Sequence, residues 1–467
     1  MSYGQLWSRV EALCAALAAF GVQKGDRVAF QVEKSAGVFP LHLALLAAGA
    51  VQLPLNPTYP DAEVRALLAD AGPSLVVRDP RRGVLEGPWR TATMDAHGEG
   101  SLAAAVGHGS APEAPELDAA DGAALLYTSG TTGRPKGAYL THGNLQHNAE
   151  SLVDAWGFTP DDVLLHILPL FHTHGLFVAT HCALASGASM VAQPGFDAAA
   201  VFGELPRCTV IMGVPTHYTR LLSDPRFDHE AVRGIRLMVS GSAPMSADLH
   251  QQLLQRTGLS VLERYGMTET SMLTSNPLDG DRRRGRVGSP LRGVRLRVVD
   301  DSGAAVAAGD VGQVEVKGPN VFGGYWRRPD LDAETFTADG WFRTGDLGRL
   351  DDDGSLELVG RSKDLIISGG LNVYPKDVES VLDSTAGIVE SAVVGIPDAD
   401  LGERVVAAVV VEEGADVDPQ DLRRSLRDRL APYQVPKHVT VLETLPRNAM
   451  GKVEKTVLRS MLGAHVP

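Results

Sequence analysis

Cysteine, long apolar runs and positive charge are all scarce in this chain of 467 residues. The three cysteines, Cys14, Cys182 and Cys208, have neither paired nor metal-like spacing, which argues against a disulfide framework and favours a reducing compartment. No apolar run reaches the roughly 18–20 residues that a membrane span needs. The N-terminus has no basic segment followed by an apolar core, so no secretory signal is visible. We therefore expect a cytosolic protein.

The balance of charge is negative. A net charge of −14 argues against sequence-independent binding of nucleic acid. It also means that an anionic substrate must be held by cations placed locally. Apolar residues make up 44% of the chain and charged residues 21%, an ordinary globular composition, and the length predicts about two or three domains.

The pattern along the chain divides it into three parts. Helical and strand patterns alternate first, beginning with apolar residues at helical spacing from Leu6 to Phe20 that end at Gly21. Such alternation predicts an α/β domain with a mostly parallel sheet and helices on its faces. Short strands with turn signals predict a small β-rich subdomain at about residues 290–360, within a large domain of residues 1–361. Residues 362–467 have the pattern of a small α+β domain.

One glycine-rich stretch, YTSGTTGRPKG, extends from Tyr127 to Gly137. Its glycines let the backbone approach a ligand closely, and successive N–H groups in such a turn form a concavity that binds anions. It is not a Walker loop, because Lys136 is followed by glycine and not by the Ser or Thr that would bind Mg²⁺. The dinucleotide pattern G-x-G-x-x-G does not occur in the chain. The composition suits a phosphate chain, although a polar surface loop would have a similar one.

Four further stretches place polar residues at predicted strand ends or beside glycine. The small residues of SGSAP, 240–244, leave room for a flat ring against the backbone. In ERYGMTET, 263–270, a hydroxyl suited to phosphate and a carboxylate suited to Mg²⁺ follow a strand. Asp346 of WFRTGDLG and Arg361 of VGRSKDLIISGG suit ribose hydroxyls, and Lys452 lies on a glycine-flanked segment. Each alone could be a turn residue or a surface charge, but chance explains their joint occurrence poorly.

Taken together, these motifs resemble those of the adenylate-forming superfamily, which includes acyl-CoA synthetases, firefly luciferase and the adenylation domains of peptide synthetases. The matching segments, in family order, are YTSGTTGRPKG, PLFHTHG, GVPTHY, ERYGMTET, GYWRRP, DGWFRTGDLG, GRSKDLIISGGLNVYP and PRNAMGKVEK. The resemblance implies two half-reactions. A carboxylate and ATP form an acyl-adenylate and pyrophosphate, and a thiol, here that of CoA, then displaces AMP, with Mg²⁺ as the cofactor.

The resemblance also implies roles for individual residues. Lys452 matches the lysine that bridges the substrate carboxylate and the α-phosphate as negative charge develops there. Thr268 and Glu269 match contacts to the α-phosphate and to magnesium, and Thr128 is expected to join Glu269 at the metal. By the same resemblance, the ATP-binding residues are Thr128, Ser129, Gly130, Thr131, Thr132, Gly133, Lys136, Gly241, Ser242, Ala243, Glu263, Tyr265, Gly266, Met267, Thr268, Asp346, Arg361 and Lys452.

In that superfamily the small domain rotates between the half-reactions. Lys363 matches the hinge, and Gly369 and Gly370 match a loop that comes to the active site beside the pantetheine path of CoA. His172 matches a gate residue beside the acyl site, which makes it a catalytic and substrate-binding candidate. A buried structural histidine would have the same sequence signal. The family usually has some tens of residues before the equivalent of SYGQLW, so the start of this chain is a departure from it.

Within the superfamily the chain is most similar to malonyl-CoA synthetases, through LPLFHTHGLF, TVIMGVPTHYTRLL, YGMTETSMLTSNPLDGDRR, VKGPNVFGGYWRRPD and LNVYPKDVES. Malonate keeps a second carboxylate after the first is activated, and the planar fork of arginine suits it. We expect Arg282 or Arg283 to hold that carboxylate, the alternative being a solvated basic loop.

Other functions remain open from the sequence. Methylmalonate is a further possible substrate, and a short-chain or aryl acyl-CoA synthetase is the main alternative enzyme. A stand-alone amino-acid adenylation enzyme is less favoured, because the usual acidic partner for an amino group has no clear match. A catalytically inactive AMP-binding protein would be expected to lose Lys452 or Glu269, and both are present.

Overall fold

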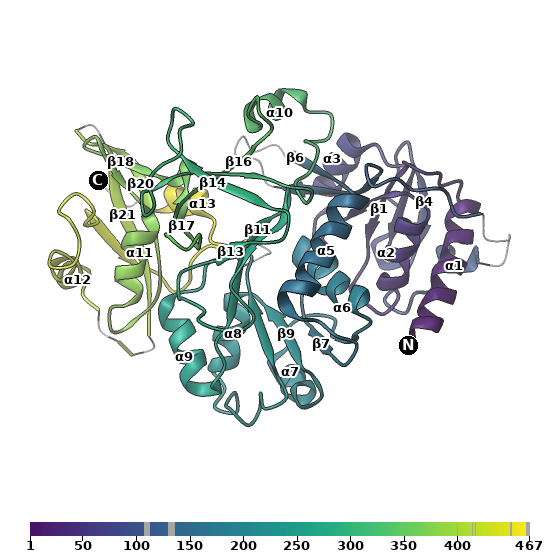
Figure 1. The fold of residues 1–467 in the computed structure, drawn as a ribbon, viewed down its shortest axis with the longest axis horizontal. Coiled ribbons are helices and arrows are strands. Elements are labelled where there is room, and N and C mark those ends of the chain that lie inside the picture. The colour runs from purple at the N-terminus through teal and green to yellow at the C-terminus, as the bar shows by residue number, and fades with distance from the viewer. Residues whose placement is uncertain are drawn as a thin grey trace.

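A computed structural model describes residues 1–106, 113–128, 136–398, 400–412, 414–415, 417–448 and 451–463. These residues form four β-sheets, two of them large and mostly parallel (Figure 1). The predicted α/β architecture, with a β-rich part and a C-terminal α+β part, is confirmed. No helix in the described part of the chain is long and apolar enough to span a bilayer.

The first sheet carries the glycine-rich stretch at its edge. Its strands, in spatial order, are β4 (Arg90–Thr93), β3 (Leu75–Arg78), β1 (Arg27–Gln31), β2 (Val51–Pro54), β5 (Gly122–Thr128) and β6 (Lys136–Thr141). The first five are parallel, and β6 is antiparallel to β5 with Thr128 opposite Lys136. The stretch therefore begins and ends at one point of the sheet, because its flanking strands form a hairpin.

Helices cover both faces of this sheet, as the alternation of strand residues requires. They are α1 (Tyr3–Ala19), α2 (Val38–Ala47), α3 (Asp61–Ala71) and the short α4 (Ser101–Ala104). Val28 and Phe30 of β1 belong to the core that α1 and α2 share, whereas Ala29 between them packs in the core of α3. A capping box between Ser2 and Gln5 begins α1. The predicted first helix is confirmed.

The second sheet brings two of the predicted site segments to one edge. Its strands, in spatial order, are β13 (Ser289–Pro290), β12 (Ser271–Ser275), β11 (Leu262–Met267), β10 (Leu237–Ser240), β9 (Val210–Gly213), β7 (Val163–His166) and β8 (Ser189–Ala192). Strands β7 to β11 are parallel. Ser240 pairs with Glu263, so Gly241 after β10 lies beside Arg264, and β11 continues to Met267 before residues 268–269 follow at the same edge.

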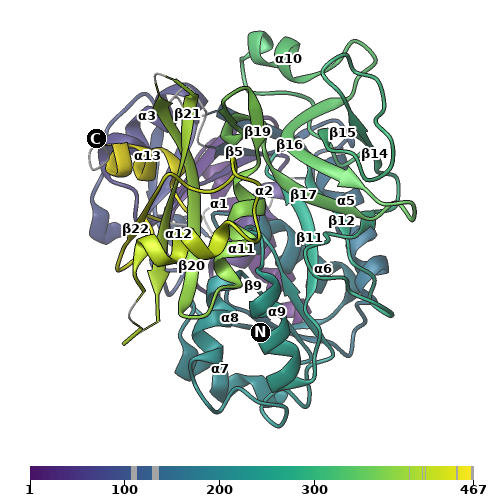
Figure 2. The ribbon, with the colours of Figure 1, turned by 90° about the vertical axis from the view of Figure 1, so that its left-hand side faces the viewer.

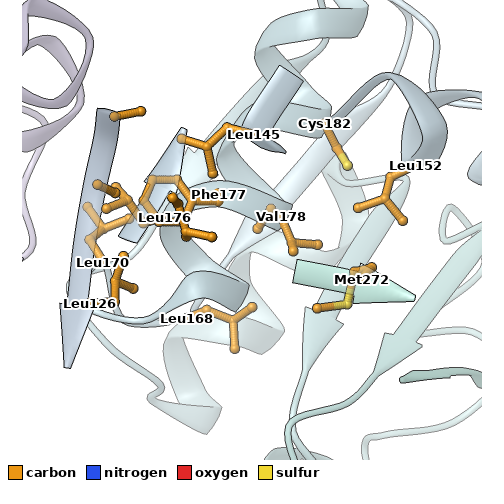
Figure 3. Packing of buried hydrophobic residues seen from close by; sticks show 14 of the residues in the cluster. Leu126, Leu145, Leu152, Leu168, Leu170, Leu176, Phe177, Val178, Cys182 and Met272 are labelled. Atoms are coloured by element: carbon orange, nitrogen blue, oxygen red, sulfur yellow. The ribbon is translucent and has the colours of Figure 1, made fainter. Parts of the chain in front are cut away.

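A single core joins the first two sheets. It includes side chains from α5 (His142–Trp156), a π-helix at His174–Ala179 and α6 (Thr180–Ser186). Figure 3 shows Leu126 of β5 near Phe177 of the π-helix, with Leu152 of α5 above Met272 of β12. The far face of the second sheet packs on a separate core with α7 (Ala198–Glu204), α8 (Pro215–Leu222) and α9 (Ala247–Thr257).

The predicted β-rich part is an antiparallel sheet of four strands. They are β14 (Arg295–Val299), β15 (Gly312–Lys317), β16 (Phe342–Leu350) and β17 (Leu356–Arg361), with α10 (Pro329–Thr335) between β15 and β16. In the register of β16 and β17, Asp346 lies opposite Arg361. The two residues predicted to contact ribose are therefore cross-strand neighbours.

The C-terminal part lies at the left of Figure 1 and faces the viewer in Figure 2. Its elements are β18 (Ile366–Ser368), β19 (Leu371–Val373), α11 (Pro375–Asp383), β20 (Ile388–Asp398), β21 (Gly402–Val411), α12 (Pro419–Leu426), β22 (His438–Val441) and α13 (Lys455–Gly463). Two hydrophobic clusters, both drawn only from residues after 361, cover the two faces of its sheet. This separation agrees with the predicted domain boundary after Arg361, which stays a prediction.

Trp156 is expected to be a major contributor to the stability of the shared core. It is fully buried, and its Nε1 donates to Ser275 Oγ at 2.9 Å. Trp156→Ala should lower the free energy of unfolding by about 3–5 kcal/mol through the cavity it leaves. Trp7, which is exposed and donates to Glu11, is the matched control. Trp7→Ala should change the free energy of unfolding by less than about 0.5 kcal/mol. Urea unfolding followed by far-UV circular dichroism measures both, and equal effects would contradict this account of the core.

Candidate active site

Asp346 is the centre of the predicted ribose side. It is buried on β16, and Arg361 Nε lies 2.8 Å from its Oδ1. Tyr265, at the end of β11, donates its hydroxyl to Oδ2 at 2.5 Å. The carboxylate raises the pKa of Arg361, and burial followed by Asp346 raises that of Tyr265. Asp346 is thus held from two sides, and its remaining lone pairs can still accept hydroxyl groups.

Glu269 is the candidate metal ligand. It is buried directly after β11, burial raises its pKa, and its Oε1 accepts a hydrogen bond of 3.0 Å from the Tyr325 hydroxyl. The ring of Tyr325 in turn lies 5.4 Å from Lys136 Nζ at the start of β6. Tyr325 was not among the predicted site residues, although the GYWRRP motif contains it. It connects the predicted metal ligand to the predicted phosphate-binding lysine.

Most of the predicted phosphate-binding loop lies outside the described residues. This applies to Ser129, Gly130, Thr131, Thr132 and Gly133. Thr128 and Lys136, at the two ends of the loop, are described and face each other across the β5–β6 hairpin. Of these two, Lys136 has its Nζ 5.4 Å from the centroid of the Tyr325 ring.

The segment after β10 has an unusual backbone. Ser242 has a φ of 69°, in the left-handed region, and its Oγ lies 3.3 Å from His174 Nδ1. A Cβ at Gly241 would collide with the guanidinium of Arg264. Gly241 therefore leaves room for an arginine as well as for the predicted adenine ring beside Ala243.

Arg264 is a buried cation with unused donors. It lies on β11, its exposed fraction is 5%, and among the described residues no hydrogen-bond partner is found for Nε or Nη2. Burial lowers its pKa to about 9, so it remains charged at neutral pH. An unpaired buried charge costs several kcal/mol. This arrangement is stabilised when an anion enters and accepts from the two free donors.

His172 lies within the electrostatic field of this arginine. Burial, followed by the positive charges of Lys452 and Arg264, lowers the pKa of His172 to about 3. The backbone N–H of His174 donates to His172 Nδ1 at 3.2 Å. A neutral His172 that accepts at Nδ1 carries its hydrogen on Nε2. It is therefore a hydrogen-bond donor, and not a cation or a base, at neutral pH.

A second buried cation, Lys34, has a different environment. Its Nζ lies 2.9 Å from His166 Nδ1, 2.7 Å from His166 O and 2.8 Å from Leu168 O. Burial lowers its pKa to about 7. All three ammonium hydrogens have acceptors, so Lys34 joins the first sheet to the loop after β7 and is not free for a ligand.

The predicted substrate-binding arginines are occupied elsewhere. Arg282 donates to the carbonyl oxygens of Pro277, Ser260 and Leu278. Arg283 pairs with Asp351, at 3.0 Å, and with Asp353. These contacts stabilise the loop between β12 and β13 and leave neither guanidinium free, so the structure does not support the expectation that one of them holds a substrate carboxylate.

Among the other predicted contacts around β11, Glu263 has its Oε1 3.5 Å from His250 Nδ1 on α9. Its carboxylate therefore faces that helix. Gly266 and Met267 end the strand at an irregularity in its pairing with β12, and a Cβ at Gly266 would collide with the β12 backbone. Thr268 follows, half-buried, next to Glu269.

Lys452 reaches the same site from the C-terminal part. Its backbone N–H donates to Asn448 Oδ1 at 3.1 Å, and its carbonyl accepts from Asn448 N at 2.9 Å. Burial and the positive charge of Arg361 lower the pKa of its ammonium, while the carboxylates of Asp346 and Glu269 raise it. Lys452 retains solvent contact, and its ammonium interacts electrostatically with Arg361, Asp346 and Glu269.

The remaining predicted residues lie at the base and edge of the C-terminal part. Lys363 is exposed in a 3₁₀ turn, Ser362–Asp364, between β17 and β18. Gly369 and Gly370 form the exposed turn between β18 and β19, both with positive φ. Their predicted roles as hinge and CoA-binding loop stay predictions.

Comparison with known proteins places this arrangement in a family. Residues 1–326 match the AMP-binding enzyme family model, and residues 377–452 match the model of the AMP-binding enzyme C-terminal domain. The chain belongs to the AMP-binding enzyme family. The predicted adenylate-forming superfamily is confirmed, and the protein is an AMP-forming acyl-CoA synthetase that uses ATP and CoA.

Individual relatives differ in the acids that their names specify. The chain is 37% identical to a feruloyl-CoA synthase of an Amycolatopsis species over 99% of this chain and 94% of the relative. It is 37% identical to the mitochondrial malonate–CoA ligase of Mus musculus over 99% of this chain and 87% of the relative. The crystal structure of ATP-bound MatB from Rhodopseudomonas palustris is similar with a TM-score of 0.95 and 48% identity, over 99% of this chain and 93% of that one.

Lys452→Ala tests the first half-reaction of an AMP-binding enzyme. Loss of a cation that acts on charge developing at the carboxylate and α-phosphate should reduce adenylate formation by at least about 100-fold. The fold should persist, because the lysine retains solvent contact. Pyrophosphate release measures the first step, and thioester formation from supplied acyl-adenylate and CoA should continue. Pyrophosphate release near the wild-type rate would contradict the assignment.

Lys363→Pro tests the hinge. Proline fixes φ near about −65° and should restrict rotation of the C-terminal part from the orientation in which Lys452 faces the nucleotide site. Adenylate should form while thioester formation decreases strongly. Quenched-flow measurement of both products separates the steps, and Lys363→Ala is the matched control. An equal loss of both steps in the proline variant would indicate misfolding or a hinge elsewhere.

Proposed function

We propose that this acyl-CoA synthetase is a malonate–CoA ligase. One malonate carboxylate attacks the α-phosphorus of ATP and displaces pyrophosphate, and the CoA thiol then attacks the acyl carbon and displaces AMP. The observation that carries the proposal is Arg264, a buried cation with two unused donors. An acid with a distal carboxylate supplies the missing anion.

The relatives alone do not select the acid, because those named for ferulate and malonate have the same identity to this chain. The chemistry of the site favours the dicarboxylate. The distal part of an aromatic acid such as ferulate carries no negative charge at neutral pH, so it would need an apolar pocket. Placed against Arg264, such a group would leave the guanidinium buried and unpaired. A charged carboxylate matches its planar donors.

The other side chains divide the chemistry between them. We assign Lys452 and the Nε2–H of His172 as two donors to the carboxylate that reacts. Lys452 is placed to stabilise negative charge at that carboxylate and the α-phosphate, as in the Lys452→Ala prediction. Asp346 accepts ribose hydroxyls. Arg264 fixes the distal end of the acid, so that the reactive carboxylate is oriented without a change in the protein.

Magnesium fits the residues that are present. Tyr325 occupies one oxygen of Glu269, and lone pairs remain on that carboxylate for a hard cation. Among the described residues, no group of three or more His, Cys, Asp or Glu side chains could hold a metal by itself, which suits an ion shared with nucleotide phosphates. Glu269 and Thr128 would hold it. When bound, the ion neutralises charge on the departing pyrophosphate.

A panel of acids tests the proposal directly. With ATP, Mg²⁺ and CoA at fixed concentrations, pyrophosphate release should give the highest kcat/KM for malonate among malonate, methylmalonate, acetate, butyrate, benzoate and ferulate. A preference for ferulate or benzoate would overturn the proposal in favour of an aryl acyl-CoA synthetase. A preference for acetate or butyrate would indicate a short-chain enzyme.

Arg264→Met should remove the preference for malonate. A charge-assisted hydrogen bond contributes about 1.5–3 kcal/mol, so kcat/KM for malonate should fall about 10- to 150-fold, whereas that for acetate should hardly change. The melting temperature should not fall, since an apolar side chain replaces an unpaired buried charge.

Arg283→Ala is the matched control for Arg264→Met, because it removes a surface arginine that pairs with Asp351. Its ratio of malonate to acetate activity should equal that of the wild type. The assignment of Arg264 would be contradicted if Arg264→Met lowered kcat/KM equally for malonate and acetate. It would also be contradicted if Arg283→Ala lowered kcat/KM for malonate alone.

A further inference from the structure

Tyr325 contacts both halves of the phosphate and metal region. Its hydroxyl donates to Glu269 Oε1 at 3.0 Å, and its ring centroid lies 5.4 Å from Lys136 Nζ. Glu269 follows β11 of the second sheet, whereas Lys136 begins β6 of the first sheet. A single side chain therefore spans the junction between the two sheets.

The position of this ring is fixed without a ligand. The backbone N–H of Tyr325 donates to Asp332 Oδ1 at 2.8 Å, and Tyr325 forms an antiparallel bridge with Ala138 of β6. Phe322 packs against the ring edge-to-face, with the ring centroids 4.9 Å apart and an interplanar angle of 80°. Only 8% of Tyr325 is exposed. These contacts leave the hydroxyl little freedom, so it can hold a carboxylate in one orientation.

We propose that Tyr325 is a positioning residue for adenylate formation. Its hydroxyl orients the Glu269 carboxylate toward a divalent cation, and its ring holds the Lys136 ammonium beside the nucleotide phosphates. The inference rests on the magnesium role of Glu269 in the proposed function. It assigns the tyrosine of GYWRRP a task beyond packing, because groups that orient a metal ligand contribute to the affinity for the metal.

Tyr325→Phe tests the hydroxyl, since it keeps the ring, the Phe322 contact and the Lys136 contact. The probe is Mn²⁺ binding in the presence of an ATP analogue with a methylene bridge between the α- and β-phosphates, without acid or CoA. Free Mn²⁺ is measured by electron paramagnetic resonance. The variant should bind Mn²⁺ about 10-fold more weakly than the wild type, while its affinity for the analogue in EDTA should be unchanged.

Two further variants separate the contacts. Tyr218→Phe is the matched control, because Tyr218 is a buried tyrosine whose hydroxyl donates to Val239 O at 2.7 Å, and it should bind Mn²⁺ as the wild type does. Tyr325→Leu removes the ring as well. It should also weaken binding of the ATP analogue in EDTA by about 2- to 5-fold, because the cation–π contact with Lys136 is lost. Melting curves confirm that each variant is folded.

Glu269→Gln separates the metal-binding role of Glu269 from the positioning role of Tyr325. Defective Mn²⁺ binding in both Glu269→Gln and Tyr325→Phe supports the inference. Defective binding in Glu269→Gln together with wild-type binding in Tyr325→Phe overturns the role of Tyr325 and leaves the proposed metal ligand intact. Wild-type binding in Glu269→Gln overturns both, because the cation is then held elsewhere. Since no acid is present, none of these outcomes depends on whether malonate is the substrate.

Discussion

The burial of the Arg264 guanidinium, with no acidic partner in the part of the chain that the structure describes, is the constraint on which this site depends. Gly241 has no side chain where the guanidinium lies, and two of its donors have no partner among the described residues. Lys34 shows how the same protein buries a cation for structure, with His166 and Leu168 accepting all three of its hydrogens. This difference in hydrogen bonding is the reason to give Lys34 a structural role and to propose Arg264 as the cation that binds a ligand.

The carboxylates of the site, in contrast to Arg264, have hydrogen-bond or ion-pair partners. Asp346 is bound by both Arg361 and Tyr265, and Glu269 is bound by Tyr325. Carboxylates whose orientation is already fixed can accept hydroxyls or a metal ion without rearrangement, whereas unpaired cations attract anionic substrates. In a chain with a net charge of −14, an anionic nucleotide and a carboxylate substrate require local cations of this kind.

Features determined by neighbouring residues could be predicted from the sequence, and those determined by distant pairing could not. The first helix and its end before Gly21 follow from local apolar spacing and a glycine, and the glycine-rich motifs identified the family. The choice of Arg282 or Arg283 stays a prediction, and the ion pair of Arg283 with Asp351, far along the chain, could not be read from the sequence. Arg264 lies in the motif ERYGMTET, but only the burial of its strand shows that its charge is unpaired. Two adjacent charged residues, Glu263 and Arg264, inside a short strand between apolar and aromatic residues were the signal that could have identified it.

The C-terminal part is joined to the rest in a way that suits movement between half-reactions. Its two hydrophobic clusters include no residue before 362, so rotation would not open either core. Across the boundary, Lys376 Nζ donates to Leu358 O at 2.5 Å, and the backbone at Gly451 approaches Thr216 of α8. Both of these contacts are polar or lie at the backbone, and polar contacts can be exchanged for water when such a part rotates. Under the proposed function, rotation of this part would deliver Lys452 to the nucleotide for the first step and withdraw it for the second, while Arg264, in the large N-terminal part, would keep the acid in place.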